Sequence, residues 1–299
     1  MKKVFYFIIL MAIVYLAYTY RENIILLYNE YFVPIESKVT KLEKNKYYRN
    51  YNYTYAKNVD NFIPESKDDL INIYYTIVNS GMDNFTFYCS RKYDDCINDI
   101  NDIANNQNLI SNINNFVHPY NSFKSIITEV ESTGKISLKI DKVYDDEMIV
   151  ILNYKLDEII KKTIKDSDTL KEKLKKIHDY IINNTTYDKE RSDKKIVKYK
   201  SDNAYGVLIE NYGLCGGYTD AMMLFLEKFN IPNYKISTEN HVWNYVKLDD
   251  QWLHIDLTWD DPITEDNKNV LDDSFFLVTD EELTKLEKEE HNYNKDIFK

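Results

Sequence analysis

The spacing of apolar and polar positions changes several times along the 299-residue chain. Residues 4–18 form a nearly unbroken apolar run. Apolar side chains then recur at helical spacing through residues 60–116, for example at Leu70 and Ile73. Strand-like segments follow on both sides of Gly134, which predicts a β-hairpin. We therefore expect an apolar N-terminal helix, a mostly helical region and a hairpin, in that order.

The apolar run at residues 4–18 predicts attachment to a membrane. Lys2 and Lys3 precede it and Arg21 closes it, as in a signal peptide or a signal-anchor. The run is close to the lower limit of about 17 residues for a spanning helix. Because no A-x-A cleavage site follows, we favour an uncleaved transmembrane helix within residues 1–22. The lysine pair would remain inside, so we expect a single-pass protein of the cell membrane whose C-terminal domain is extracytoplasmic.

Two larger regions follow the apolar run. Residues 23–146 begin with an apolar stretch and continue with a charged stretch at residues 36–46 that is typical of a stalk. The helical pattern and the hairpin complete this region. Residues 147–299 should form a second domain, in which we expect Asp168 to cap a helix that ends before Asn183. Its apolar stripe consists of Leu170, Leu174, Ile177 and Ile181.

Composition and charge limit the possible functions. Hydrophobic side chains make up 44% of the chain, which is enough for a full-sized core. The formal net charge of −11 disfavours binding to nucleic acid, because nucleic acid is itself a polyanion. The sequence has neither a phosphate-binding glycine pattern nor a calcium loop. Cys89 and Cys96 could form a disulfide in an oxidising compartment or remain two buried thiols, and both alternatives stay open.

The most informative segment begins at Cys215. Gly213 precedes this cysteine by two residues, and Gly216 and Gly217 follow it directly. The apolar stretch that comes next predicts a buried helix with Cys215 at its start, where the helix N-terminus would stabilise a thiolate. A single cysteine before an apolar helix is nevertheless more often an inert buried thiol. The catalytic interpretation therefore depends on the neighbours of Cys215.

Two strands joined by a two-residue Asp-Asp loop supply these neighbours. They cover residues 241–248 and 251–258, and the short loop fixes the register of their hairpin. His241 and Asp256 then share one face of the sheet as diagonal neighbours, at about 7–8 Å between their backbones. A carboxylate can reach an imidazole N–H at that separation. We therefore predict that Cys215, His241 and Asp256 form a catalytic triad.

These three residue types suit acyl-transfer chemistry. A thiolate attacks a carbonyl carbon and forms a thioester, the imidazole protonates the leaving amine, and the carboxylate orients the imidazole ring. Water as the acceptor then gives hydrolysis, whereas a lysine side chain gives an amide crosslink. The triad alone does not choose between these outcomes. The chemistry requires neither a metal nor a cofactor.

Three motifs occur in one order along the chain. They are Cys215, the His-Val-Trp-Asn motif that starts at His241, and the motif Trp-Leu-His-Ile-Asp-Leu-Thr-Trp-Asp-Asp-Pro at residues 252–262. This order resembles the transglutaminase-like superfamily of papain-like thiol enzymes. The resemblance extends over residues 178–291, and residues 274–283 resemble bacterial members. It implies an α+β, transglutaminase-like core in which a Cys-bearing helix packs on an antiparallel sheet.

The resemblance also assigns roles to residues. It implies that Cys215 is the nucleophile, His241 the base and Asp256 the orienting acid. Animal transglutaminases use a tryptophan upstream of the cysteine to hold the oxyanion, but here all three tryptophans follow Cys215. The backbone N–H of Cys215 is one candidate donor in its place. The side chain of Tyr205 or Tyr212 is a second, although packing is the more common role for such tyrosines.

Other polar residues near the motifs are expected to be structural. They are His178, His254, Asp260 and Asp261. His254 shares a face with Asp256 but should pack within its strand, and the others should belong to scaffold and turn. The three tryptophans should form core or cleft walls. His118 and His291 carry no pattern that suggests a role.

We expect a surface enzyme that acts on peptide or protein amides, with peptidase-type hydrolysis as its leading activity. Crosslinking of Gln and Lys side chains is a second hypothesis. A non-catalytic module that binds peptide or cell-wall components is a third, and an unreactive Cys215 would favour it. The expected partners are a peptide or protein substrate, which the cell wall could supply, and the membrane through the N-terminal helix.

Overall fold

The computed structural model describes residues 2–21, 23–24, 39–90, 92–262, 271–287 and 289–298. The helices are α1 (Lys2–Thr19), α3 (Lys67–Ser80), α4 (Cys96–Asn105), α5 (Gln107–Asn115), η2 (Pro119–Asn121), α6 (Asp146–Thr163), α7 (Leu170–Asn184), α8 (Lys189–Lys194), the π-helix η3 (Gly206–Glu210), α9 (Cys215–Lys228) and α10 (Asp280–Leu286). The strands are β1 (Asn84–Tyr88), β2 (Phe123–Val130), β3 (Lys135–Lys142), β4 (Thr186–Tyr187), β5 (Tyr212–Gly213), β6 (Asn233–Ser237), β7 (Val242–Leu248), β8 (Gln251–Ile255) and β9 (Phe276–Val278).

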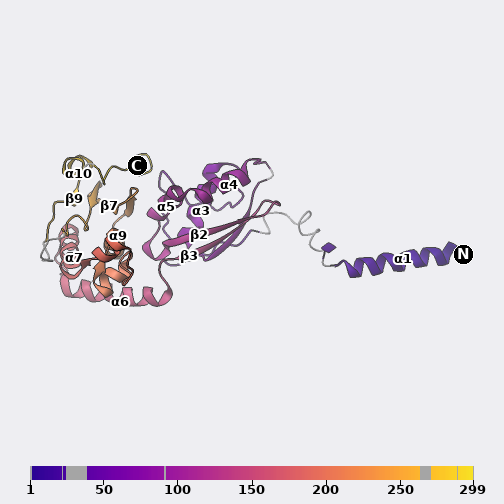
Figure 1. The fold of residues 1–299 in the computed structure, drawn as a ribbon, viewed down its shortest axis with the longest axis horizontal. Coiled ribbons are helices and arrows are strands. Elements are labelled where there is room, and N and C mark those ends of the chain that lie inside the picture. The colour runs from indigo at the N-terminus through magenta and orange to yellow at the C-terminus, as the bar shows by residue number, and fades with distance from the viewer. Residues whose placement is uncertain are drawn as a thin grey trace.

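The helix α1 occupies the apolar run, as its hydropathy predicts (Figure 1). Its 18 residues include Lys2 and Lys3, so its apolar part is shorter than the about 17 residues that spanning requires. No helix within the described residues is both long enough and apolar enough to cross a membrane. The predicted transmembrane helix is therefore not supported. Of the charged stretch expected to form a stalk, residues 36–38 lie outside the described residues, whereas residues 39–46 pack on the region that follows, where Thr40 exchanges hydrogen bonds with Thr86 of β1.

The region after residue 39 is built on a three-stranded antiparallel sheet with the strand order β1-β3-β2. The predicted hairpin is confirmed as β2 and β3, and Gly134 takes a left-handed φ of 84° in its turn. The strand β1 was not expected, and it buries Phe85 and Phe87. A five-residue strand is too short for its periodicity to separate it from neighbouring helices. The region thus combines the expected helices and hairpin with one additional strand.

A disulfide joins the end of β1 to the start of α4. Cys89 and Cys96 are bonded, with their Cα atoms 5.9 Å apart. Of the two alternatives that the sequence left open, the structure therefore contains the bridge. Cys215 remains as the free thiol.

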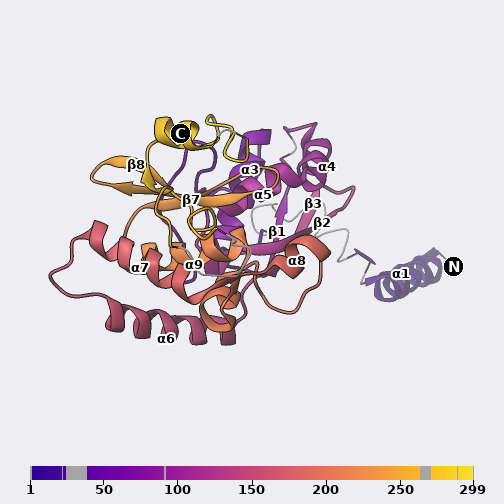
Figure 2. The same cartoon turned by 60° about the vertical axis from the view of Figure 1, so that its left-hand side comes forward.

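The C-terminal region packs the Cys-bearing helix on an antiparallel sheet, as predicted. The sheet has the order β6-β7-β8-β9, and α9 contacts β6 and β7 on one side and α7 on another (Figure 2). Ten consecutive residues of α9, from Gly217 to Leu226, are buried. A helix that is apolar around most of its circumference needs such cover on several sides.

Arg49 connects the two regions. Its guanidinium is 9% exposed and donates hydrogen bonds to the backbone carbonyls of Phe116 and Asn233. It also forms an ion pair with Glu227 of α9. A buried guanidinium that loses one of these partners would leave an uncompensated charge, so this contact fixes how the regions meet.

The hairpin of β7 and β8 has the predicted register. Leu248 faces Gln251 across a turn formed by Asp249 and Asp250, whose φ angles are 49° and 63°. Positive φ at both central residues is the type I′ geometry that matches the twist of a two-residue hairpin.

The strand β8 ends earlier than expected. The last ladder pair is Asn244 with Ile255, and Asp256 already lies outside the strand. The Asp256 carboxylate accepts the backbone N–H groups of Thr258 and Trp259, at 2.9 and 3.2 Å. These local hydrogen bonds compete with the ladder and turn the chain away from the sheet.

The cap predicted for α7 is wrong by one residue. Thr169 is the N-cap, and it forms a capping box with Glu172. Asp168 instead makes an ion pair with Lys176 at 2.6 Å. The helix also continues through Asn184, because asparagines in its last turn bond back to carbonyls four residues earlier.

The turn predicts a stability difference at Asp250. An alanine in the left-handed region costs roughly 1–2 kcal/mol, whereas glycine adopts it freely. We expect Asp250→Ala to lower the free energy of unfolding in urea by about 1 kcal/mol. Asp250→Gly is the matched control, because both variants lose the ion pair to Lys247. Equal losses in the two variants would assign the effect to that ion pair and not to the backbone.

Candidate active site

Cys215 is the first residue of α9 and its thiol is half-buried. The preceding Leu214 is extended and provides no side-chain cap. The first N–H groups of the helix therefore remain available to an anion at this end. This position favours a thiolate through the helix dipole, as the sequence predicts.

The glycines after Cys215 allow a loop to pass close to the helix N-terminus. The Ser201 carbonyl accepts the Leu214 N–H at 2.7 Å. A Cβ on Gly217 would come within 2.3 Å of that same carbonyl oxygen, so a larger residue does not fit there. The Ser201 hydroxyl in turn donates to Asp188 at 2.7 Å. The Ser201 loop thus fixes the backbone conformation around Cys215.

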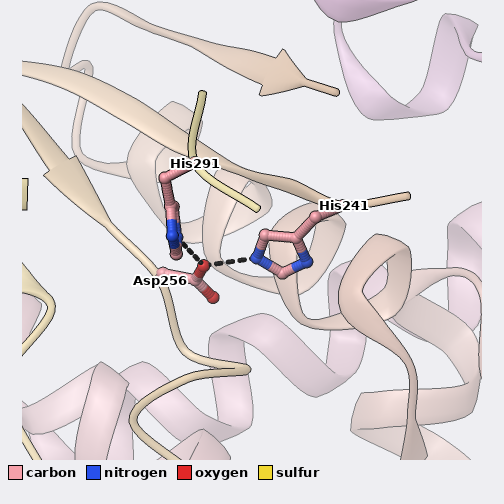
Figure 3. A group of neighbouring side chains, drawn as sticks. All are labelled: His241, Asp256 and His291. Atoms are coloured by element: carbon pink, nitrogen blue, oxygen red, sulfur yellow. Dashed lines mark hydrogen bonds and ion pairs between the residues drawn. The ribbon is translucent and has the colours of Figure 1, made fainter. Parts of the chain in front are cut away.

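His241 and Asp256 meet at the edge of the sheet, as predicted. His241 directly precedes β7, and its Nε2 lies 2.5 Å from Oδ2 of Asp256 (Figure 3). The Cys215 side chain lies close enough to His241 to contribute to the raised pKa of that histidine. Since Nε2 is engaged by the carboxylate, Nδ1 is the ring nitrogen left for the thiol. The three predicted residues are therefore brought together in one chain of contacts.

The Asp256 carboxylate is 1% exposed and accepts four hydrogen bonds. Oδ1 accepts the two backbone N–H groups of Thr258 and Trp259, and Oδ2 faces both His241 and His291. An ionised carboxylate has about four lone-pair sites, so all of them are used. Burial alone would raise the pKa of Asp256, but its two histidine partners hold this pKa well below its usual range.

The same contacts keep His241 protonated. Burial lowers the pKa of His241, but the charge and hydrogen bond of Asp256, together with Cys215, outweigh it and raise this pKa to about 10. His241 is then an imidazolium at neutral pH. An imidazolium beside a thiol at a helix N-terminus favours the thiolate–imidazolium pair that nucleophilic attack requires.

His291 is the functional-site residue that the sequence did not indicate. It lies 35 residues after Asp256, beyond α10 and outside any helix or strand. Its Nε2 is 2.8 Å from Asp256 Oδ2 and its Nδ1 is 3.0 Å from Glu287 Oε2. Neither periodicity nor motif spacing connects such a residue to the hairpin. The available signal in the sequence was the spacing of Glu287 and His291, which are four residues apart and follow a predicted helix, so their side chains can meet.

His241, Asp256 and His291 also form the grouping that could hold a metal among the described residues. They place one ligand atom each within 4.8 Å of one another. Tetrahedral zinc with bonds of about 2.0–2.1 Å separates its ligand atoms by roughly 3.3 Å. The two histidine nitrogens lie 2.5 and 2.8 Å from Asp256 Oδ2, which is the spacing of hydrogen bonds. Hydrogen bonds from the two histidines to Asp256 therefore explain these distances better than coordination to zinc.

The turn after Asp256 is braced by buried polar pairs, in agreement with the expected scaffold roles. His178 Nε2 of α7 lies 2.9 Å from Oδ2 of Asp260, whose Oδ1 accepts the Phe275 N–H. The hydroxyl of Tyr218, on α9, donates to Asp261 at 2.5 Å, and burial raises the pKa of Asp261 to about 6. The helix that carries the thiol is thus connected directly to the turn that carries the carboxylate.

His254 has a structural role, as expected. Its Nδ1 accepts the indole N–H of Trp243 at 3.0 Å, so this nitrogen carries no proton. Its Nε2 therefore donates to Asp280, at 2.7 Å. Burial lowers the pKa of His254, which keeps this neutral tautomer. Trp243 itself is 1% exposed and belongs to the core.

The two tyrosines considered as oxyanion donors make packing contacts. The ring of Tyr212 is stacked on Tyr199, with centroids 3.8 Å apart. The ring of Tyr205 lies 4.6 Å from the Lys200 ammonium. These contacts agree with the packing role, and the backbone N–H of Cys215 remains the candidate donor.

A cavity of about 640 Å³ opens beside the triad. Gly216 and Val242, which directly follow Cys215 and His241 in sequence, both line it. Its opposite wall comes from the N-terminal region. The residues of that wall include Ser111, Asn114, Asn115, Ser122 and Lys124. The cleft is thus shared between two regions, and hydrogen-bonding side chains form much of its lining.

Comparison with known proteins agrees with this geometry. Residues 157–257 match the family model of the transglutaminase-like superfamily, and this segment contains all three triad residues. This part of the chain is therefore a transglutaminase-like domain, which confirms the resemblance seen in the sequence. No curated protein matches the chain.

Two solved structures show weak similarity. A TGase aligns with a TM-score of 0.35 and 16% identity over 46% of this chain and 44% of its own. A candidate cysteine protease from Cytophaga hutchinsonii aligns with a TM-score of 0.28 and 14% identity over 45% of this chain and 61% of its own. This chain thus spans less than two thirds of either protein.

The protonation of His241 predicts a pH-dependent stability. The pKa of His241 is about 10 in the folded protein and about 6.5 when unfolded, so its contribution is complete below about pH 6.5 and is lost as the pH rises through about 10. We expect the difference in free energy of unfolding between wild type and His241→Ala to shrink as the pH rises from about 7 to about 10, measured by urea unfolding.

His118→Asn is the matched control for this measurement. Burial holds the pKa of His118 well below its usual range, so its contribution to stability is complete above about pH 6.5. The difference between wild type and this variant should stay constant over the same pH interval. A constant difference for His241→Ala as well would contradict the imidazolium.

Proposed function

We propose that this protein is a thiol hydrolase that cleaves peptide or protein amide bonds through an acyl intermediate on Cys215. The observation that carries the proposal is the convergence of Cys215, His241 and Asp256: Cys215 interacts electrostatically with His241, whose Nε2 lies 2.5 Å from Asp256 Oδ2. A thiol at a helix N-terminus, an imidazolium held by a buried carboxylate, and an adjoining cleft are the parts that this chemistry requires.

The reaction follows from these positions. The Cys215 thiolate attacks the carbonyl carbon of the amide, and the developing oxyanion is stabilised by backbone N–H groups at the start of α9. His241 then gives its Nδ1 proton to the leaving amine, which leaves a thioester on Cys215. A water molecule attacks the thioester while His241 accepts its proton, and the acid product departs with the free thiol restored.

The lining of the cleft supports a peptide-like substrate. Its polar side chains include Asn114, Asn115 and Ser237, which suit the N–H and C=O groups of an extended backbone. Five basic and four acidic side chains line the cleft, whereas acidic residues outnumber basic ones 49 to 38 in the whole chain, so the lining has less net negative charge than the chain. An acidic or neutral peptide segment would therefore enter with the least repulsion.

The disulfide between Cys89 and Cys96 supports action in an oxidising compartment. Disulfides persist in secreted and surface proteins and are rare in the reducing cytosol. We therefore place the proposed hydrolase outside the cytoplasm.

Alkylation of Cys215 tests the proposal without knowledge of the substrate. We expect iodoacetamide to modify Cys215 rapidly at about pH 6.5, where an unperturbed thiol of pKa about 8.5 is only about 1% thiolate. His241→Ala should slow this reaction by at least about tenfold, because the ion pair is lost. Without reductant the disulfide protects the other two cysteines, so mass spectrometry reads one site. Slow alkylation of the wild-type protein would leave a non-catalytic binding module as the alternative.

Peptide turnover separates hydrolysis from crosslinking. On a peptide library we expect Asp256→Asn to lower kcat by about 10²–10⁴-fold, because the imidazolium loses its orienting charge. His118→Asn, a buried histidine far along the chain from the triad, should retain activity. Incorporation of a labelled primary amine into a Gln peptide, without release of acid, would replace hydrolysis by amide crosslinking as the activity.

A further inference from the structure

We infer that His291 is a positioning residue of this active site, an imidazolium clamped between Glu287 and Asp256 that fixes the carboxylate and makes His241 a better proton donor. The inference rests on the proposed function, because it concerns the same triad. It adds a fourth and a fifth residue to the chain of contacts that begins at Cys215.

The geometry around His291 sets its protonation. Both ring nitrogens face carboxylate oxygens, Nε2 with Asp256 at 2.8 Å and Nδ1 with Glu287 at 3.0 Å. The His291 side chain is 1% exposed, so water does not replace either partner. A neutral imidazole has one N–H and one lone pair, and the lone pair would point at a carboxylate oxygen. Both contacts are hydrogen bonds only when both nitrogens carry a proton.

Neither carboxylate supplies that proton. Asp256 already accepts two backbone N–H groups and the proton of His241. Glu287 accepts the backbone N–H groups of Glu289 and Glu290, and that of His291 itself. Burial would raise the pKa of Glu287, but these donors and the His291 side chain lower it to about 2. Two ionised carboxylates therefore enclose the imidazole.

Aromatic rings surround the cation on its remaining sides. The centroids of Trp243, Trp259 and Phe275 lie 4.7, 5.4 and 5.4 Å from the ring of His291. Phe275 is stacked on it at an interplanar angle of 16°. Ring centroids within about 6 Å of a cation stabilise it through their quadrupoles. The pocket therefore accommodates an imidazolium without water.

Charge now alternates along the site. His241 is positive, Asp256 negative, His291 positive and Glu287 negative. Because Asp256 is shared between two cations, it holds the proton of His241 less tightly than a carboxylate with one partner would. His241 must surrender this proton to the leaving amine, so His291 favours that step. Removal of the His291 charge should strengthen the attraction of Asp256 for the His241 proton. Acylation of Cys215 should then be slower.

The titratable groups that the described part of the chain places against His291 are few. Glu287 and Asp256 contact its nitrogens, and the ring of His241 lies 5.2 Å away between centroids. His254 interacts with it electrostatically. His254 is neutral, so the charges that act on the His291 ring are those of the two carboxylates and His241.

The test is NMR titration of the full chain labelled with ¹⁵N-histidine. In the wild type we expect both nitrogens of His291 to be protonated at neutral pH. In His291→Gln, which keeps an amide donor but loses the charge, the pH at which His241 loses its proton should rise by about one unit or more. Glu287→Gln, which removes one of the two anions that enclose His291, should lower the pH at which His291 itself loses a proton, and His118→Asn should leave both titrations unchanged.

Two outcomes would overturn the inference. One is a neutral tautomer of His291 in the wild type, and the other is an unchanged His241 titration in folded His291→Gln. The alkylation of wild-type Cys215 is a separate measurement, so failure of the proposed thiol chemistry is distinguishable from failure of the role of His291. If both stand, peptide turnover in His291→Gln should show reduced kcat with its alkaline limb moved to higher pH, which loss of packing alone would not produce.

Discussion

The burial of one negative charge, on Asp256, determines how the active site is assembled. A carboxylate that is 1% exposed is tolerated only when its oxygens are fully hydrogen-bonded. Its donors come from the start of β7, from the turn after β8 and from the segment after α10. Three parts of the chain must therefore converge on one side chain, and the imidazole of His241 is oriented by the same contacts that compensate the buried charge.

The surrounding structure protects this convergence. Two helices are fastened to the turn that carries Asp256, α7 through His178 and α9 through Tyr218. At the other end of the site, the Ser201 loop packs so closely on α9 that only glycine fits at position 217. The thiol and the carboxylate are thus placed by backbone packing and buried polar pairs.

Local rules explain which parts of this arrangement could be predicted from the sequence. Strand parity and a two-residue turn are enough to bring His241 and Asp256 to one face, and a glycine-flanked cysteine before an apolar helix is a local pattern as well. His291 and β1 depend on contacts between distant segments, which periodicity does not report. The N-terminal wall of the cleft was missed for the same reason. The contact between His241 and Asp256 could therefore be predicted, because it follows from a local hairpin. The contacts of His291 could not, because they join distant segments.

The division of the cleft between two regions has an evolutionary consequence. The transglutaminase-like segment at residues 157–257 contains the triad, whereas Asn114 and Lys124 of the opposite wall lie outside it. Substitutions on that wall can alter the shape and charge of the cleft without touching Cys215, His241 or Asp256. Arg49 joins the two regions through buried contacts, so only substitutions that preserve these contacts can keep the wall in place. The wall of the cleft and the segment that holds the triad can thus change at different rates within one polypeptide.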